Sequence, residues 1–184
     1  MSDLLGAVYA GDEQRVAALL ATDPELDVFE AAALGRTERV AELLDAQPDL
    51  VAAWAGDGFT PLHLAAFFRN PGTARLLVER GAPVDPVARH EQLRVTPLQS
   101  AVAAGQAATA ALLLDHGADP NACQEGRFTP LHSAAANGDE AIVDLLLARG
   151  ADPAAAADDG RTAADFASES GHDALAERLA AAAG

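Results

Sequence analysis

The most reactive side chain in the sequence is the thiol of Cys123, which lies between His116 and His132. A thiol nucleophile needs an imidazole base beside it and a third group that orients this base. The sequence places His116 at the end of one predicted helix and His132 at the start of another, and no orienting group can be identified. A thiol or hydrolase-type enzyme is therefore the weakest of three functional hypotheses.

Other catalytic and ligand-binding motifs are absent from the sequence. It contains no HExxH, CxxC, GxSxG or GxxxxGK, and Asp158-Asp159-Gly160 lacks the alternating oxygen ligands of a calcium loop. We expect no catalytic residue, no metal and no cofactor. A single cysteine also excludes an intramolecular disulfide framework.

The strongest signal in the sequence is an internal repeat. Thr60-Pro61-Leu62-His63 recurs as TPLQ at 96–99, as TPLH at 129–132 and, degenerately, as TAAD at 162–165. A Gly-Ala pair follows the first three Thr residues after 21 positions, and a mid-unit Gly precedes an i, i+3, i+4 pattern of apolar residues. The pattern fits six units, whose mid-unit positions are Gly11, Gly35, Arg69, Gly105, Gly138 and Gly171.

The repeated residues indicate pairs of helices. A Thr hydroxyl can cap a helix N-terminus, and Pro suits the first helical position because no N–H is needed there. The mid-unit Gly then ends the first helix in a left-handed turn, and a second helix runs through the apolar pattern. The 46 Ala residues favour helices that approach one another closely. The remaining residues of each unit must form a turn or a short hairpin.

These residues resemble the ankyrin repeat family, of bacterial type and with about six units. The match spans the full unit in FTPLHSAAANGDEAIVDLLLARGADP, from Phe128 to Pro153. The resemblance implies a mainly α fold, an ankyrin-repeat solenoid of stacked helix-turn-helix units with short β-hairpin-like loops. We expect a single domain over 1–184, with N-terminal helical units lacking full hairpins in 1–50, full repeats in 51–157 and a C-terminal capping repeat in 158–184.

The resemblance also implies structural roles for the TPLH residues. In the family the imidazole at the fourth position forms hydrogen bonds locally and between repeats. Gln99 and Asp165 replace it in two units, which fits a polar tether that accepts other hydrogen-bonding side chains. The residues expected to be structural are Thr60, His63, Thr96, Thr129 and His132.

Candidate binding residues come from irregularities between units. Phe67 and Phe68 stand where other units carry mostly small or polar residues, and in the family these positions face the concave groove. Either they form an exposed apolar patch, or the absence of the mid-unit Gly at Arg69 shifts the helix and buries one of them. The loop before Thr96 is three residues longer than the next one. The full set of expected partner-binding residues is Phe59, Phe67, Phe68, Arg89, Arg94, Arg127 and Phe128, with Tyr9, Leu34 and Trp54 as weaker candidates.

The expected function is therefore a non-catalytic protein–protein interaction module that binds an unknown protein through the concave groove and hairpin tips of the central repeats. The charge pattern supports an alternative, because residues 1–60 carry a net charge of −9 and residues 131–184 carry −7, whereas residues 61–130 are neutral. An acidic inhibitor or immunity-type protein would use those ends to mask a basic enzyme. The acidic ends disfavour nucleic acid and anionic membranes. Lacking a signal peptide, the chain is expected to be cytoplasmic and monomeric.

Overall fold

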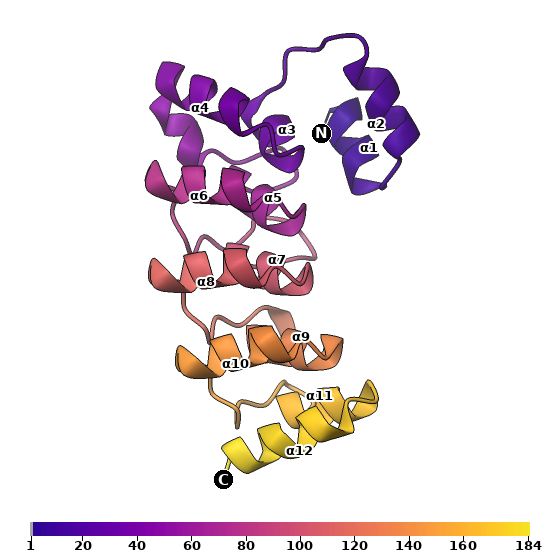
Figure 1. The fold of residues 1–184 in the computed structure, drawn as a ribbon, viewed down its shortest axis with the longest axis vertical. Helices are drawn as coiled ribbons and strands as arrows, with labels where there is room; N and C mark the ends of the chain where they lie inside the picture. The colour runs from indigo at the N-terminus through magenta and orange to yellow at the C-terminus, as the bar shows by residue number, and fades with distance from the viewer. Residues whose placement is uncertain (1) are drawn as a thin grey trace.

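The computed structural model describes residues 2–184 as a row of helix pairs joined by loops (Figure 1). These residues form twelve α-helices, two short 3-10 helices and no β-strand, although one isolated antiparallel bridge joins Ala156 to Thr162. The elements are α1 (Asp3–Tyr9), α2 (Glu13–Leu20), α3 (Val28–Ala33), α4 (Thr37–Ala46), η1 (Pro48–Ala52), α5 (Pro61–Phe67), α6 (Pro71–Glu79), α7 (Pro97–Ala103), α8 (Ala107–Asp115), η2 (Glu125–Arg127), α9 (Pro130–Asn137), α10 (Glu140–Ala148), α11 (Ala163–Glu169) and α12 (Asp173–Ala182).

From α3 onward the odd-numbered and even-numbered helices form two layers. Helices α3, α5, α7, α9 and α11 pack one on the next, and α4, α6, α8 and α10 form a second row beside them, on the left in Figure 1. We call the side formed by the odd-numbered helices the first-helix face. Each of α5, α7, α9 and α11 is preceded by a loop that returns from the previous unit. The first-helix face and these loops together position the candidate binding residues.

Each unit starts and turns as its sequence predicts. Thr60, Thr96, Thr129 and Thr162 are N-caps, and each accepts a hydrogen bond from the backbone N–H three residues later within a capping box. The mid-unit Gly residues have φ between +64° and +83°. Arg69 adopts the same left-handed conformation, with φ +64°. Arg69 thus replaces Gly without changing the turn, at the cost of the strain that a side chain meets there.

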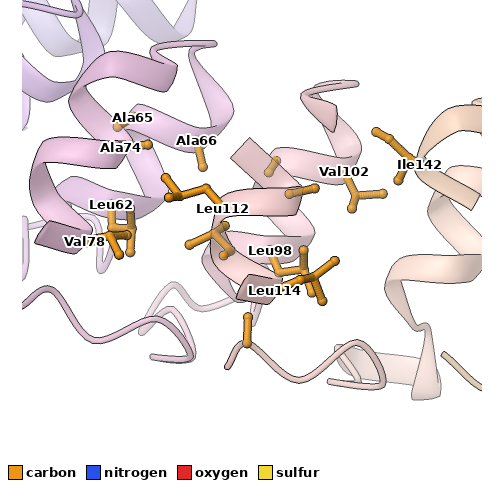
Figure 2. Close-up of a cluster of buried hydrophobic side chains, with 14 of the residues drawn as sticks. Leu62, Ala65, Ala66, Ala74, Val78, Leu98, Val102, Leu112, Leu114 and Ile142 are labelled. Atoms are coloured by element: carbon orange, nitrogen blue, oxygen red, sulfur yellow. The ribbon is translucent and has the colours of Figure 1, made fainter. Parts of the chain in front are cut away.

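The core lies between the two layers and is rich in alanine. Ala65, Ala101, Ala134 and Ala167 are fully buried on successive first helices, where small side chains let the backbones approach closely. Leucines fill the space toward the second helices, among them Leu62, Leu98, Leu77 and Leu113. Figure 2 shows part of this cluster, with side chains from α5, α6, α7, α8 and α10 in one continuous layer.

A buried imidazole ties each TPLH unit to the loop that follows it. Nδ1 of His63 accepts hydrogen bonds from the backbone N–H of Thr60 at 3.2 Å and from its hydroxyl at 2.8 Å. With Nδ1 acting as an acceptor, the ring proton sits on Nε2, which donates to the carbonyl oxygen of Val95 at 3.0 Å. His132 repeats this arrangement with Thr129 and the carbonyl oxygen of Ala155.

The other two units show how the tether tolerates substitution. Oε1 of Gln99 accepts from the N–H of Thr96 at 2.9 Å, and its Nε2 donates to the carbonyl oxygen of Ala122 at 2.9 Å. Asp165 accepts from the N–H of Thr162 but has no donor of its own. Its Oδ2 also accepts from the hydroxyl of Thr162 at 2.8 Å.

A second tether links the turns that end the second helices. Oδ1 of Asn121 accepts from the N–H of Asp152, and Nδ2 of Asn121 donates to the carbonyl oxygen of Gly150. One unit earlier Asp85 stands at the equivalent position, and its Oδ2 accepts from the N–H of Asp119. A carboxylate cannot make the second bond, because it has no donor. Burial and the Asp119 charge hold the pKa of the Asp85 carboxyl above its ordinary value.

The N-terminal helix pair departs from the regular stack. Helix α1 packs against α3 and buries Leu4, Leu5 and Ala7, but no residue of α2 is buried. The apolar pattern predicted for α2, namely Val16, Leu19 and Leu20, is only half-buried. In Figure 1 the pair lies beside the odd-numbered helices instead of in line above α3 and α4. Its position brings α1 onto the first-helix face.

The histidine tether predicts a specific acid sensitivity. Burial lowers the pKa of His63 from its ordinary 6.5 to about 4. Between pH 6.5 and pH 4 the His63 side chain binds a proton in the unfolded chain but not in the folded chain. The contribution of His63 to the free energy of unfolding is therefore complete above pH 6.5 and is lost as the pH drops toward 4. A difference of this size corresponds to about 3 kcal/mol. His63→Gln copies the natural Gln99 tether. Between pH 7 and pH 4 its free energy of unfolding should fall by about 3 kcal/mol less than that of the natural chain.

Urea unfolding of both proteins across this pH range measures the difference. The other titrating groups are shared, so their contributions cancel in the comparison. Identical losses in the two proteins would show that His63 titrates in the folded state as it does in the unfolded chain.

The Asp85 position predicts a stabilising substitution. Asp85→Asn supplies the donor that Asn121 uses one unit later and removes a carboxylate beside Asp119, so the free energy of unfolding should rise by about 1 kcal/mol. The reverse substitution, Asn121→Asp, should lower it by a similar amount. Thermal unfolding at neutral pH checks both, and a destabilising effect of Asp85→Asn would contradict the equivalence of the two positions.

Candidate protein-binding surface

Four aromatic side chains meet on the first-helix face around α5. The ring of Phe67 lies edge-on to Phe68, with centroids 5.2 Å apart, and Phe68 lies edge-on to Tyr9 at 5.3 Å. Tyr9 is also 6.5 Å from Phe59. Phe67 is 48% exposed, whereas Phe68 is half-buried against the hydrophobic core. The two phenylalanines therefore differ, and Phe68 is covered by Tyr9 of α1 and not by a shift of α5 at Arg69.

Tyr9 is held in place by a polar contact. Its hydroxyl donates to Oδ2 of Asp57 at 3.0 Å, while Oδ1 of Asp57 accepts from the N–H of Phe59 at 3.2 Å. Burial, reinforced by the Asp57 charge, raises the pKa of Tyr9 above its ordinary value. At the other end of α1, the hydroxyl of Ser2 donates to Glu30 at 2.6 Å. Both ends of α1 are thus fastened to later units.

Three of these aromatic side chains, Tyr9, Phe59 and Phe67, line an open, largely apolar pocket, whereas Phe68 does not. The pocket lies between α1, α5, α7 and the loop before α7, and its volume is about 510 Å³. We call it the Tyr9 pocket, and its main walls are Tyr9, Phe59, Phe67, His90, Leu93 and Val95. Leu64, Ser100 and Ala103 contribute to it from α5 and α7.

Three of the six main walls were not among the binding residues predicted from the sequence. His90 stacks on Phe59 with centroids 5.5 Å apart, Leu93 is 50% exposed, and Val95 precedes the Thr96 cap. Leu93 could have been found, because a large apolar residue within the charged stretch of the longer loop is a visible signal. The contributions of His90 and Val95 depend on how the loop folds over α5.

The arginines predicted from the sequence to bind a partner, Arg89, Arg94 and Arg127, lie on the loops beside this pocket. The guanidinium of Arg89 lies over the ring of Trp54 at 4.1 Å from its centroid. Arg94 and Arg127 are exposed, and no carboxylate of residues 2–184 lies within ion-pair distance of either. Arg127 has a left-handed backbone, with φ +56°.

Phe128 belongs to a different aromatic cluster. Its ring stacks on His132 at 5.2 Å and meets Phe166 edge-on at 5.1 Å, and Arg161 covers Phe166 at 4.2 Å. Sequence reasoning missed Phe166. The structure therefore does not place Phe128 in the Tyr9 pocket. Leu34 is half-buried at the end of α3 and does not line the pocket either.

The hypothetical thiol site is not assembled. Sγ of Cys123 donates to the carbonyl oxygen of Asn121. Both ring nitrogens of His132 form hydrogen bonds, with Thr129 and with the carbonyl oxygen of Ala155. Nδ1 of His116 forms a hydrogen bond with the carbonyl oxygen of Leu112. Among residues 2–184 no three His, Cys, Asp or Glu side chains are grouped as metal ligands would be. In the same part of the chain, each helix is too short or too polar to span a bilayer.

Comparison with known proteins gives a consistent result. A family model described as ankyrin repeats (3 copies) matches residues 28–124, 84–157 and 123–184. Neurogenic locus notch homolog protein 4 of Homo sapiens is 37% identical over 115 residues, which is 62% of this chain and 5% of that protein. The E3 ubiquitin-protein ligase XB3 of Oryza sativa subsp. japonica is 40% identical over 86 residues, or 46% of this chain and 18% of the ligase.

A second rice protein, the probable E3 ubiquitin-protein ligase XBOS31, is 36% identical over 96 residues, which cover 52% of this chain and 21% of the relative. The matches thus span a minor part of each relative's length. The family-model matches together extend from residue 28 to residue 184, through every helix pair after the first. The chain therefore belongs to the ankyrin repeat family.

Proposed function

We propose that this chain is a non-catalytic protein-binding module whose partner docks on the first-helix face of the third to fifth units and on the loops beside it. The observation that carries the proposal is the Tyr9 pocket, an open apolar pocket bordered by two side chains, Phe67 and Leu93, that are each about half exposed. Ankyrin repeats generally mediate protein–protein interaction, which agrees with this assignment.

The energetics of such a surface favour binding to another protein. The exposed parts of these aromatic and leucine side chains face water in the free chain, and covering them is worth about 25 cal/mol per Å² of apolar area removed from water. Phe68 contributes less, because Tyr9 and the core already cover part of its ring. Phe59 is similarly shared between the pocket and contacts with His63 and His90.

The acidic ends support a second candidate, in which the chain masks a basic enzyme. Net charges of −9 over residues 1–60 and −7 over residues 131–184 would attract such a partner electrostatically. This association would weaken steeply as salt is added, whereas an apolar contact would not. Salt dependence therefore separates the two candidates.

The pocket predicts a separable loss of binding. Phe67→Ala combined with Leu93→Ser removes the two exposed walls, and the affinity for the partner should fall by about tenfold or more. Val87→Ser is the matched control: Val87 is apolar, 41% exposed and on the same loop, but does not line the pocket. Affinity capture from the source cell's lysate at low and high salt, read by mass spectrometry, identifies the partner, and titration then gives the affinities.

A protein retained at high salt by the natural chain and by Val87→Ser, but lost with the double variant, is the expected result. A protein that all three chains retain at low salt and release at high salt would indicate that the acidic ends bind the partner. Equal retention by all three at high salt would contradict the pocket.

A further inference from the structure

Arg94 and Arg127, on the loops beside the Tyr9 pocket, are two of the five arginines in residues 2–184 that form neither an ion pair nor a cation–π contact. In residues 2–184, six of the twelve arginines form ion pairs with carboxylates, namely Arg15, Arg39, Arg80, Arg149, Arg161 and Arg178. Arg89 has Trp54 as its partner. Arg94 and Arg127 contact neither a carboxylate nor an aromatic ring among the described residues, in a chain with 28 acidic side chains.

The two arginines lie on loops that contribute residues to the pocket, Arg94 directly beside lining residues and Arg127 three positions from one. Arg94 stands between Leu93 and Val95, which line it, and Arg127 follows Gln124, which also lines it. Each lies two residues before the Thr cap of its unit, so the two occupy equivalent positions in successive units. Because stacked helices are about 8–10 Å apart, equivalent positions in successive units match residues three positions apart in an extended segment, which cover about 10 Å.

The acidic groups near the pocket do not satisfy these arginines. Both oxygens of Asp57 accept hydrogen bonds within the site, from Tyr9 and from Phe59. Glu91 and Glu125 share the two loops with the arginines but form no ion pair with them. Residues 61–130 are neutral in total, whereas residues 1–60, which contribute Tyr9 and Asp57 to the pocket, carry a net charge of −9.

We propose that the Tyr9 pocket receives one large apolar side chain of a partner segment, and that Arg94 and Arg127 bind two carboxylates of the same segment. The segment is extended, and its acidic residues are three positions apart. An Arg guanidinium can bind a carboxylate through two parallel hydrogen bonds, which gives direction as well as attraction. This inference rests on the proposed function and adds the chemistry of the partner.

Peptide selection tests the partner's chemistry without knowledge of the natural partner. Random dodecapeptides displayed on phage are selected at physiological salt on the natural chain, on Arg94→Gln with Arg127→Gln, and on Arg36→Gln with Arg75→Gln. Arg36 and Arg75 are the matched control, because they are exposed and lack carboxylate partners but do not line the pocket. All four positions are on the surface, so the variants should fold.

The natural chain and the control are expected to enrich peptides with one large apolar residue and two acidic residues three positions apart. Affinities of the enriched peptides should fall about tenfold, or about 1.4 kcal/mol, with the Arg94 and Arg127 variant, and stay within about twofold with the control. Phe67→Ala should weaken the same peptides. Because the whole chain is strongly acidic, non-specific attraction would favour basic peptides and works against this result.

Three outcomes would overturn the inference: enrichment of basic peptides, enrichment of apolar peptides whose affinity does not depend on Arg94 and Arg127, or no enrichment over the input library. The second would indicate a pocket that recognises apolar groups alone. If partner capture still depends on Phe67 and Leu93, the protein-binding proposal stands and only the partner's acidic character is wrong. If that dependence is also absent, the surface itself is misassigned.

Discussion

The close packing of successive first helices is the constraint on which the rest of the structure depends. Fully buried alanines at Ala65, Ala101, Ala134 and Ala167 let these helices approach, and the tethers of His63, Gln99 and His132 attach each helix to the following loop. In a repeat protein each unit contacts only its neighbours, so this interface sets the geometry of the whole stack. Loops spaced by the same interval carry Arg94 and Arg127 at equivalent places.

The Tyr9 pocket arises where that regularity is broken. The N-terminal pair does not continue the stack, and α1 instead brings Tyr9 against Phe68, Phe59 and Asp57. The longer loop before α7 adds His90 and Leu93 to the lining. A regular array would lack both contributions. The irregular units therefore form the Tyr9 pocket, and the regular units hold it in position.

Much of the fold follows from the sequence, because its signals are local and repeated. The Thr caps, the left-handed turns and the helix pairs each depend on residues within one unit, and Arg69 shows that the pattern predicts the turn even where Gly is missing. The position of α1 and α2 could not be predicted this way. Their apolar spacing matches a regular unit, and only the contacts of Tyr9 and Ser2 with distant residues show where the pair lies.

The candidate site was predictable in part for the same reason. Phe67 and the exposed arginines stand out when units are aligned, but Phe128 pairs with Phe166 of the next unit and His90 reaches Phe59 from another loop. The central claim is that the partner binds at the Tyr9 pocket, and site-specific photocrosslinking in source-cell extract tests it most directly. The photoreactive residue p-benzoylphenylalanine replaces Leu93 in the pocket, Val87 outside it, or Glu177 at the acidic C-terminal end. The account predicts one partner adduct at position 93 and none at 87 or 177. Adducts at 177 with none at 93 would contradict it.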